Sequence, residues 1–514
     1  MINRRDFLKL TFISTFYPHI LTSCGKKAEN LQTFPQGIAS GDPKPNGITL
    51  WTRINPYVFD KEYISVEISN RPDFSDILVK QTGKIEPSKN YTAKFYITSE
   101  ELLPWSKYYY RFIYKDKKSK TGTFKTLPDK NQNVEKIRFA VLNCQDYSTG
   151  NFFTHKHLAE ENIDFVLFLG DYIYEYSYDK EAKKVLREIY LPSGNDVASD
   201  IEDYYYLYNT YKSDIYLQEV HRKFPFIAVW DDHEYANDCY GYHAPDHFIK
   251  EEQKLKNLRI QASKAWFYNM PVNIPFSETS YDSIKVYRSF QFGNLMKLIL
   301  TDERLFRSEH PCGERKFQRY LIKGCGNEKS PGRTMLGETQ LDWFFNQLDN
   351  YQIWTVWANP VSFMELKLND YYISFDSWDG YQYEREKILF KIKEENIKNM
   401  FILTGDLHSF VSGYPRLDGE NVVPEFITTS ATSSNLNEIL PIDIDVSFLE
   451  ELILLENKHI KYFNSSTNGY SIIEVYKDYV DITFKSVDIL NLKKNVKIEK
   501  KFRIYSDTGE FKEI

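Results

Sequence analysis

From about residue 135 onward, the chain contains compact apolar runs that end in polar residues. The runs are "IRFAVLNCQ", "IDFVLFLGD", "FPFIAVWDDHE", "LMKLILTDE", "YQIWTVWANP" and "FILTGDLH". Runs that are apolar at every position are typical of strands buried on both faces of a sheet. In layered α/β folds, ligands bind beyond the carboxyl ends of such strands. We therefore expect the polar run ends to lie at one rim of the core.

Helical periods lie between several of these runs. Apolar residues recur at helical spacing at Leu341, Phe344, Phe345 and Leu348, and again through "EREKILFKIK". The tyrosine-rich "DYYYLYNTY" is typical of the start of a packed helix, and from about Tyr462 the alternation in "NGYSIIEVYKDYVDITFKSVD" predicts edge strands. The expected fold class is α/β, with a layered β-sheet core flanked by helices over residues 135–505.

Residues 32–128 have a different pattern of apolar and polar positions. Short alternating strands are predicted at "GITLWTRI", "YISVEISN", "ILVKQTGKI", "YTAKFYIT", "KYYYRFIY" and "SKTGTFKT", separated by turn clusters such as "NRPDFSD". This pattern predicts a small antiparallel β-sandwich. The polar stretch "TLPDKNQNVEK" indicates a linker to the second domain.

Residues 1–24 have the layout of an export signal. Paired Arg4 and Arg5 precede an apolar segment from about Leu8 to Leu21, which indicates the twin-arginine route and the twin-arginine export machinery as a partner. The closing "LTSC" resembles a bacterial lipobox, so we expect a lipid anchor at Cys24. A frayed amphipathic helix is the alternative. The expected location is the periplasm or cell surface.

Charge and composition exclude some classes of protein. The net charge of −7 over 514 residues gives no general basic footprint, so nucleic acid is not an expected partner. No uninterrupted 18-residue apolar stretch occurs in the body of the chain, which argues against a polytopic membrane protein. Of the five cysteines, Cys312 and Cys325 could close a loop in an oxidising compartment, with two free thiols as the alternative.

Four run ends carry the candidate chemistry. They supply Cys144; Asp171 and Tyr174; Asp231, Asp232, His233 and Glu234 with Asn237; and Asp406 and His408. One acid at a strand end is usually a cap or turn residue. If the strands share a sheet, however, several carboxylates meet, and two charges about 4 Å apart repel by about 4 kcal/mol at an effective dielectric of 20. Bound cations would offset that repulsion.

The mixture of side chains indicates the type of metal. Thiolate, phenolate and imidazole suit a transition metal, whereas carboxylates and an amide suit calcium or magnesium. Other site chemistries fail on the sequence: "HEYAN" lacks the second histidine of a zinc-protease helix, and neither GxxxxGK[ST] nor GxSxG occurs. We therefore expect a polynuclear metal site.

Several motifs resemble a known family. "GDYIY" resembles the GDxxY element of metallophosphoesterases related to purple acid phosphatases, "WDDHE" stands where they carry GNHE, and "GDLH" where they carry GHxH. A fuller resemblance is to the PhoD-type alkaline phosphatase and phosphodiesterase family. It rests on "GIASGDP", "LWTR", "NCQDYSTGNF", "FLGDYIYEY", "WDDHEYAND", "DSWDGYQYER", "LTGDLHS" and "EFITTSATSS".

The resemblance implies a fibronectin-like N-terminal domain, a metallophosphoesterase-like core, and a ferric ion, Fe(3+), beside two calcium ions, Ca(2+). It implies hydrolysis of phosphate monoesters and diesters outside the cytoplasm. On the matching positions, iron would be held by Cys144, Asp171, Tyr174 and His408. Asp171 would also bridge to calcium, whose other ligands would be Asp232, Asn237 and Asp406; whether Asp231 or Asp232 contacts metal stays open.

The expected reaction is in-line attack on phosphorus by a metal-bound hydroxide. His233 is the candidate for steadying the transition state or protonating the leaving oxygen, with a structural role as the alternative. Arg304 and Arg307 could clamp phosphate, or pair with Asp302 or Glu303.

Two other functions stay open on the sequence. One is a phosphodiesterase or phospholipase D-like enzyme acting on wall polymers or phospholipids. The other is an envelope polymer-binding lipoprotein with a degenerate catalytic domain, which the loss of a ligand would favour, and no ligand is lost.

Overall fold

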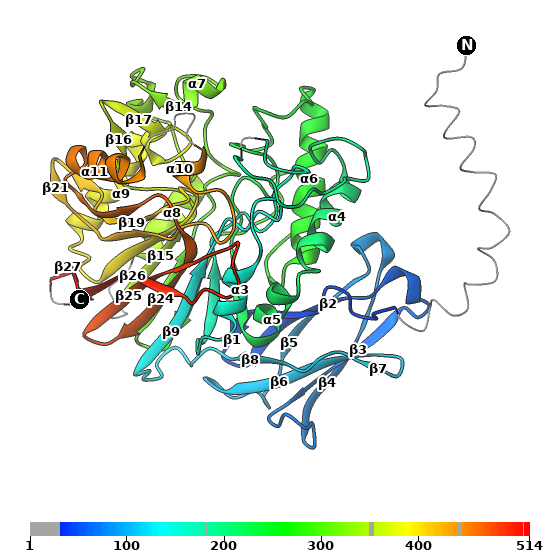
Figure 1. Cartoon of the computed structure of the whole chain (residues 1–514). Helices are drawn as coiled ribbons and strands as arrows, with labels where there is room; N and C mark the ends of the chain where they lie inside the picture. The colour runs from blue at the N-terminus through cyan, green and yellow to red at the C-terminus, as the bar shows by residue number, and fades with distance from the viewer. Residues whose placement is uncertain (1–30, 181, 349–353, 440–444, 507) are drawn as a thin grey trace, which may run out of the picture.

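The computed structural model describes residues 31–180, 182–348, 354–439, 445–506 and 508–514. The predicted export signal and Cys24 therefore lie outside the described residues. In the described part of the chain, no helix is both long enough and apolar enough to cross a membrane. Figure 1 shows the N-terminal strands in blue at the lower right, with the rest of the chain above and beside them.

The largest sheet has ten strands in the order β27-β26-β25-β24-β9-β10-β11-β1-β2-β5. Their bounds are β1 Ile38–Lys44, β2 Gly47–Arg53, β5 Thr92–Thr98, β9 Lys136–Leu142, β10 Phe165–Phe168, β11 Pro225–Ala228, β24 Asn468–Tyr476, β25 Tyr479–Val487, β26 Lys497–Tyr505 and β27 Phe511–Glu513. Strands β9, β10, β11 and β1 run parallel. Every residue of β10 is buried, as a strand covered on both faces requires.

The N-terminal strands divide between two sheets. A five-stranded sheet contains β3 Tyr63–Ser69, β4 Ile77–Lys84, β6 Lys107–Tyr114, β7 Lys117–Lys118 and β8 Gly122–Lys125. It packs through its own apolar cluster against β1, β2 and β5. Because β1 also pairs in parallel with β11, at Ser40–Pro225 and Gly41–Phe226, the N-terminal strands β1, β2 and β5 belong to the same sheet as the core strands. The strand predictions are confirmed, but the sequence did not predict this continuity.

A second large sheet has the order β12-β13-β15-β18-β22-β19-β23. Its strands are β12 Arg288–Phe292, β13 Met296–Leu300, β15 Trp354–Asn359, β18 Met400–Thr404, β19 Phe410–Gly413, β22 Glu425–Ile427 and β23 Ile460–Asn464. Strands β13, β15, β18 and β22 are parallel. One apolar cluster contains residues of both large sheets, such as Leu142, Leu167, Leu300 and Leu403, so the two sheets face each other across a shared core.

The described part of the chain contains nine α-helices. They are α3 Phe153–Leu158, α4 Ile201–Tyr211, α5 Ile215–Lys223, α6 Glu252–Asn269, α7 Lys316–Arg319, α8 Glu338–Gln347, α9 Gln382–Glu394, α10 Leu436–Ile439 and α11 Val446–Glu456. Helices α8 and α9, both predicted from their apolar period, pack against the outer face of the seven-stranded sheet. The tyrosine-rich segment forms α4, with four of its tyrosines buried. The remaining strands are short: β14 Tyr320–Ile322, β16 Lys367–Leu368, β17 Tyr371–Ser374, β20 Arg416–Leu417 and β21 Glu420–Asn421.

The polar run ends divide between the two large sheets. Cys144, Asp171 and Asp231 follow strands of the ten-stranded sheet, whereas Asp406 follows β18 of the seven-stranded sheet. The carboxyl ends still meet, because the two sheets are packed face to face. The candidate site residues therefore come from the carboxyl ends of strands in two facing sheets.

Candidate metal centre

The strand-end turns place their side chains through an unusual backbone conformation. Cys144, Asp171, Asp406 and His408 all have positive φ, at 49°, 57°, 61° and 54°. Left-handed backbone is uncommon outside glycine, and such residues cluster at functional sites. Gly170, with φ of 105°, is required by close approach, since a Cβ there would lie 2.5 Å from the backbone nitrogen of Asp231. The turns thus bring the two loops into contact.

Four of the predicted ligands gather into what we call the thiolate side: Cys144, Asp171, Tyr174 and His408. Cys144 Sγ lies 3.3 Å from Asp171 Oδ2, and the Tyr174 hydroxyl lies 3.2 Å from the same oxygen. His408 Nε2 is 3.4 Å from the Tyr174 hydroxyl. Ligand atoms of Cys144, Asp171 and His408 all lie within 4.8 Å of one another, a grouping that could hold a metal ion.

Ser433 and Ser434 form hydrogen bonds that orient the side chains of the thiolate side. His408 Nδ1 is 2.5 Å from the carbonyl oxygen of Ser434, so Nδ1 carries the hydrogen and Nε2 presents its lone pair to the thiolate side. Ser433 Oγ lies 2.7 Å from the Tyr174 hydroxyl and 2.9 Å from the carbonyl oxygen of Cys144. Both serines come from "EFITTSATSS", a segment to which the sequence analysis assigned no role.

A second group extends from Asp171. Ligand atoms of Asp171, Asp232 and His233 lie within 4.8 Å of one another, and so do those of Asp232, Asp238 and Asp376. We call Asp232, Asp238 and Asp376 the carboxylate side; all three are buried. Asp171 thus belongs to groups on both sides, and its carboxylate would be able to contact a cation held on either one. Asp238 and Asp376 were not predicted as ligands, although they belong to the quoted "WDDHEYAND" and "DSWDGYQYER".

Arg304 lies at the centre of the acidic residues. Its guanidinium is fully buried and bonds to Asp231 and, at 2.7 Å, to Asp376. Its Nη2 lies 3.8 Å from Asp232 and 3.9 Å from Asp406. The pairing with Asp302 or Glu303, given as the alternative to a phosphate clamp, is not found for Arg304, which pairs with Asp231 and Asp376. Asp302 instead accepts hydrogen bonds from the backbone of Arg304 and Leu305.

Three further predicted residues have defined partners. His233 Nδ1 is 2.7 Å from Glu175 Oε2, and its ring packs on Tyr174. The side chain of Asn237 donates to Asp246 at 2.9 Å. Arg307 is buried and bonds to the carboxylate of Asp376. Arg304, Arg307 and Asn237 are thus all occupied by carboxylates.

Glu234 is a structural residue of the site. Its carboxylate accepts hydrogen bonds from the backbone nitrogens of Asp171 at 3.0 Å, Tyr172 at 2.7 Å and Asp231 at 2.9 Å. It therefore fastens the loop after β10 to the loop after β11, which fixes Asp171 relative to Asp232.

Burial and mutual repulsion shape the protonation of the site. Burial, followed by the charges of Asp232 and Asp231, raises the pKa of Asp171 well above its ordinary value, although the nearby His233 lowers it. Burial and Asp231 raise the pKa of Asp406 in the same way. Burial lowers the pKa of His408 to about 4, which keeps the imidazole neutral, the form that binds metals.

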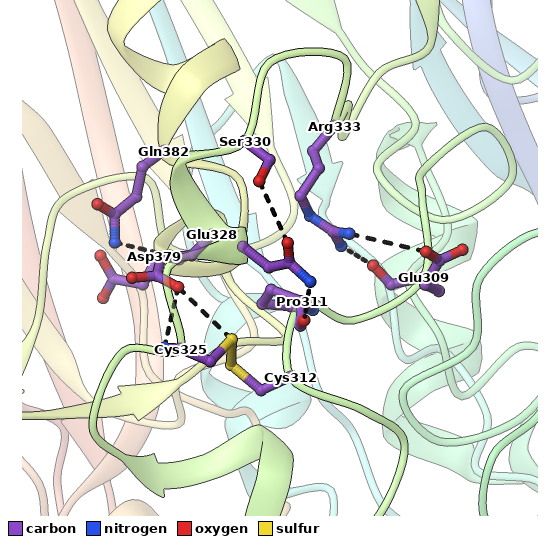
Figure 2. The surroundings of a disulfide bond; sticks show 10 residues. Glu309, Pro311, Cys312, Cys325, Glu328, Ser330, Arg333, Asp379 and Gln382 are labelled. Atoms are coloured by element: carbon purple, nitrogen blue, oxygen red, sulfur yellow. Dashed lines mark hydrogen bonds and ion pairs between the residues drawn. A yellow bond between two sulfur atoms is a disulfide. The ribbon is translucent and has the colours of Figure 1, made fainter.

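A buried ligand oxygen without a hydrogen-bond partner is a second sign that the site suits metal ions. Asp171 Oδ1 is buried and makes no hydrogen bond to any described residue. A buried carboxylate oxygen without a partner is costly, and a cation satisfies it. The fourth group of candidate ligands, Cys312, Cys325 and Glu328, does not offer thiolates, because its two cysteines form a disulfide (Figure 2).

Comparison with known proteins identifies the family. The sequence model described as PhoD-like phosphatase matches residues 139–484, and that of the PhoD-like phosphatase N-terminal domain matches residues 21–128. The chain belongs to the PhoD-like phosphatase family.

Individual relatives agree with this membership. Alkaline phosphatase D of Bacillus subtilis (strain 168) is 32% identical over 456 residues, which cover 85% of this chain and 75% of the relative. A solved structure described as the structure of PhoD superposes with a TM-score of 0.85 at 28% identity, covering 94% of this chain and 92% of that one. The expected family is confirmed, and this PhoD-like chain is a phosphoesterase.

Proposed function

We propose that this PhoD-like chain is an exported, metal-dependent phosphoesterase that hydrolyses phosphate monoesters, phosphate diesters or both. The observation that carries the proposal is the position of Asp171, whose carboxylate touches Cys144 and Tyr174 and also belongs to a group with Asp232 and His233. One carboxylate shared between two sets of donors is the arrangement that a pair of unlike metal ions requires.

The two sides of the site differ in the cations they suit. Cys144, Tyr174 and His408 offer sulfur, phenolate and imidazole to Fe(3+) beside Asp171. Asp232 and Asp406 offer hard oxygen ligands that suit Ca(2+). Asn237 is included in the proposal on the family resemblance alone, because its amide bonds to Asp246 in this structure. When bound, such ions supply Lewis acidity that lowers the pKa of water and neutralises charge on phosphate oxygens.

The chain's own side chains would divide the remaining work. Glu175 holds Nδ1 of His233, so the opposite ring nitrogen, Nε2, is left to steady the transition state or to protonate the leaving oxygen. Arg304 offsets the charge of the surrounding carboxylates, whose repulsion would otherwise disfavour the folded site. A direct phosphate clamp would use the donors that the present ion pairs leave without a hydrogen bond, which are Arg304 Nη2 and Arg307 Nε.

Export is part of the same proposal. The Cys312–Cys325 disulfide supports it, since disulfides persist in oxidising compartments and are rare in the cytosol. The twin-arginine segment and the lipobox at Cys24 add the route and a lipid anchor at the periplasm or cell surface. A preference for diesters, including wall polymers or phospholipids, is the alternative substrate class.

The test is hydrolysis of matched substrates by the purified chain. We expect release of p-nitrophenol from an aryl phosphate monoester or diester, and a loss of at least a hundredfold in kcat/KM for Asp171→Asn. Asp196→Asn is the matched control, because Asp196 is an exposed acid that pairs with the equally exposed Lys180. Equal activity of Asp171→Asn and wild type would refute the proposal. The ratio of monoester, diester and phospholipid rates decides the substrate class.

A further inference from the structure

A loop closed by a disulfide lies against the carboxylate side. Cys312 and Cys325 are bonded across a separation of 13 positions, and the segment between them carries α7 and β14. Figure 2 shows the bond beside Glu328, whose Oε2 accepts a hydrogen bond of 3.2 Å from the backbone of Cys325. Asn327 donates to the carbonyl oxygen of Pro311 at 3.1 Å, so both ends of the loop are held together.

Two side chains of this loop reach inward to Asp238. The guanidinium of Arg319 is fully buried and bonds to Asp238, and it also bonds to Asp246 at 2.7 Å and 2.9 Å. The Tyr320 hydroxyl donates to the other oxygen of Asp238 at 2.6 Å. Each oxygen of this carboxylate is therefore held by a separate residue of the loop.

Asp238, held by Arg319 and Tyr320, in turn contacts the carboxylate of Asp232. Its backbone is left-handed, with φ of 53°, and its backbone nitrogen donates to Asp232 Oδ2 at 2.6 Å. The direction of the Asp232 carboxylate therefore depends on where Asp238 is held. A third contact runs in parallel: Glu314 of the loop lies 2.7 Å from His310 Nδ1, and His310 Nε2 lies 2.9 Å from Asp376.

The loop has little apolar packing of its own to keep it in place. Phe317 and Leu321 at its outer face are 68% and 41% exposed. Its inward contacts are mainly ionic and hydrogen-bonded, and such contacts depend on geometry more than apolar burial does. A covalent closure that fixes the ends of the loop would therefore hold Arg319 and Tyr320 at Asp238.

We propose that Arg319 and Tyr320 are positioning residues for the carboxylate side of the metal centre, held in register by the Cys312–Cys325 disulfide. The inference rests on the proposed function, because it assigns Asp232 to a hard cation. It concerns outer contacts that orient a ligand, and loss of such contacts typically weakens metal affinity by about 10- to 100-fold.

Tyr320→Phe tests the inference with the smallest change, since it removes one hydroxyl. The matched control is Tyr371→Phe, because Tyr371 is a partly exposed tyrosine on β17, the strand that pairs with β14. Calcium binding is measured by equilibrium dialysis of chelator-treated protein, without reference to activity. We expect the calcium dissociation constant to rise about tenfold or more in Tyr320→Phe and to be unchanged in Tyr371→Phe.

Additional readouts separate positioning from general damage. In Tyr320→Phe, the iron content and KM for an aryl phosphate should match wild type, and added calcium should restore kcat. Calcium affinity equal to wild type in Tyr320→Phe would overturn the inference. An equal loss of iron and calcium would also overturn it, because it would indicate damage to the whole site.

The disulfide is tested by the double variant Cys312→Ser with Cys325→Ser. We expect the same weakening of calcium binding, and the same effect when a dithiol reduces the wild type. In that reaction the dithiol gives two electrons and two protons, the two cysteines become thiols, and the dithiol closes to its own disulfide. The reductant should not change calcium binding by the double variant, which controls for its action on iron or Cys144.

The outcomes distinguish this inference from the proposed function. A wild type that binds calcium but hydrolyses no phosphate ester refutes the function, while the dialysis comparison still decides the inference. Unchanged calcium affinity in both Tyr320→Phe and the double cysteine variant overturns the inference and leaves the function standing.

Discussion

Asp231 and Arg304 form a fully buried ion pair in the candidate metal centre, whereas the neighbouring Asp232 lies 3.8 Å from the same guanidinium. Asp232 belongs to two groups of candidate metal ligands and Asp231 to none of those found in the described chain. The two adjacent aspartates therefore differ in their contacts, and we propose that Asp231 holds Arg304 while Asp232 is the cation ligand.

This difference predicts opposite results for two substitutions. Asp231→Asn should lower the free energy of unfolding by about 3 kcal/mol, because it weakens a buried ion pair, and should leave calcium binding within about threefold of wild type. Asp232→Asn should weaken calcium binding by about tenfold or more. Chemical denaturation and equilibrium dialysis measure the two effects. A loss of calcium binding confined to Asp231→Asn would reverse the assignment.

Tyr174 is predicted to give the protein its colour. A phenolate and a thiolate bound to ferric iron absorb visible light by charge transfer, so Tyr174→Phe should shift or remove a visible band. Tyr176→Phe is the matched control, since Tyr176 packs against Tyr174 but directs its hydroxyl to Asp146. Visible absorption spectra of iron-loaded proteins check this. An unchanged spectrum in Tyr174→Phe would remove Tyr174 from the iron ligands.

A buried lysine predicts a pH-dependent gain in stability. Lys212 is 1% exposed, and its Nζ makes no hydrogen bond to the described residues, although it lies 4.4 Å from the Trp51 ring and 4.9 Å from the Tyr172 ring. Burial, with a smaller contribution from Lys94, lowers the pKa of Lys212 to about 7 from its ordinary value of 10.5. The unfolded chain takes up this proton near pH 10.5, whereas the folded protein takes it up only near pH 7. The folded protein therefore loses stability as the pH falls through this range.

Lys212→Met should therefore raise the free energy of unfolding by about 3 kcal/mol at pH 6, after allowance for the lost cation–π contacts. The gain should shrink towards zero near pH 10.5, the ordinary pKa of the lysine. Urea unfolding at about pH 6 and about pH 10 measures it, with exposed Lys458→Met as control. Destabilisation at the lower pH would contradict this account of Lys212.

The export proposal predicts the location of the protein in cells. Replacing both Arg4 and Arg5 by lysine should keep the chain inside the cytoplasm. The matched control replaces Lys117 and Lys118, an exposed basic pair on β7, by arginine and should leave export unchanged. Cell fractionation and immunoblotting measure the distribution, and Cys24→Ala should release the exported chain from the membrane fraction. Normal export of the variant with lysine at positions 4 and 5 would refute the proposal that the chain uses the twin-arginine route.

The sequence predicted the parts of the fold that depend on local pattern. The runs that became β9, β10, β11, β13, β15 and β18 are visible because strands buried on both faces are apolar at every position. The pairing of β1 with β11 was not predictable, because the local pattern of Ile38–Lys44 does not specify a partner 185 positions along the chain. The division of the run ends between two sheets was not predictable for the same reason, because a local pattern does not specify which strands pair.

The site shows the same limit. Cys144, Asp171 and His408 could be found because each directly follows or closely follows an apolar run. Ser433, Asp238 and Asp376 lie farther from any such run, and only the tertiary structure brings them to the ligands. Glu175 is adjacent to a predicted ligand, yet its contact with His233 depends on the loop that follows β11.

Metal content and activity measured on one preparation test the central claim most directly. Mass spectrometry should find iron and calcium in the pure protein, and a calcium chelator should abolish hydrolysis of an aryl phosphate, with activity restored by added calcium. A colourless preparation that contains neither iron nor calcium and retains full activity would contradict the account.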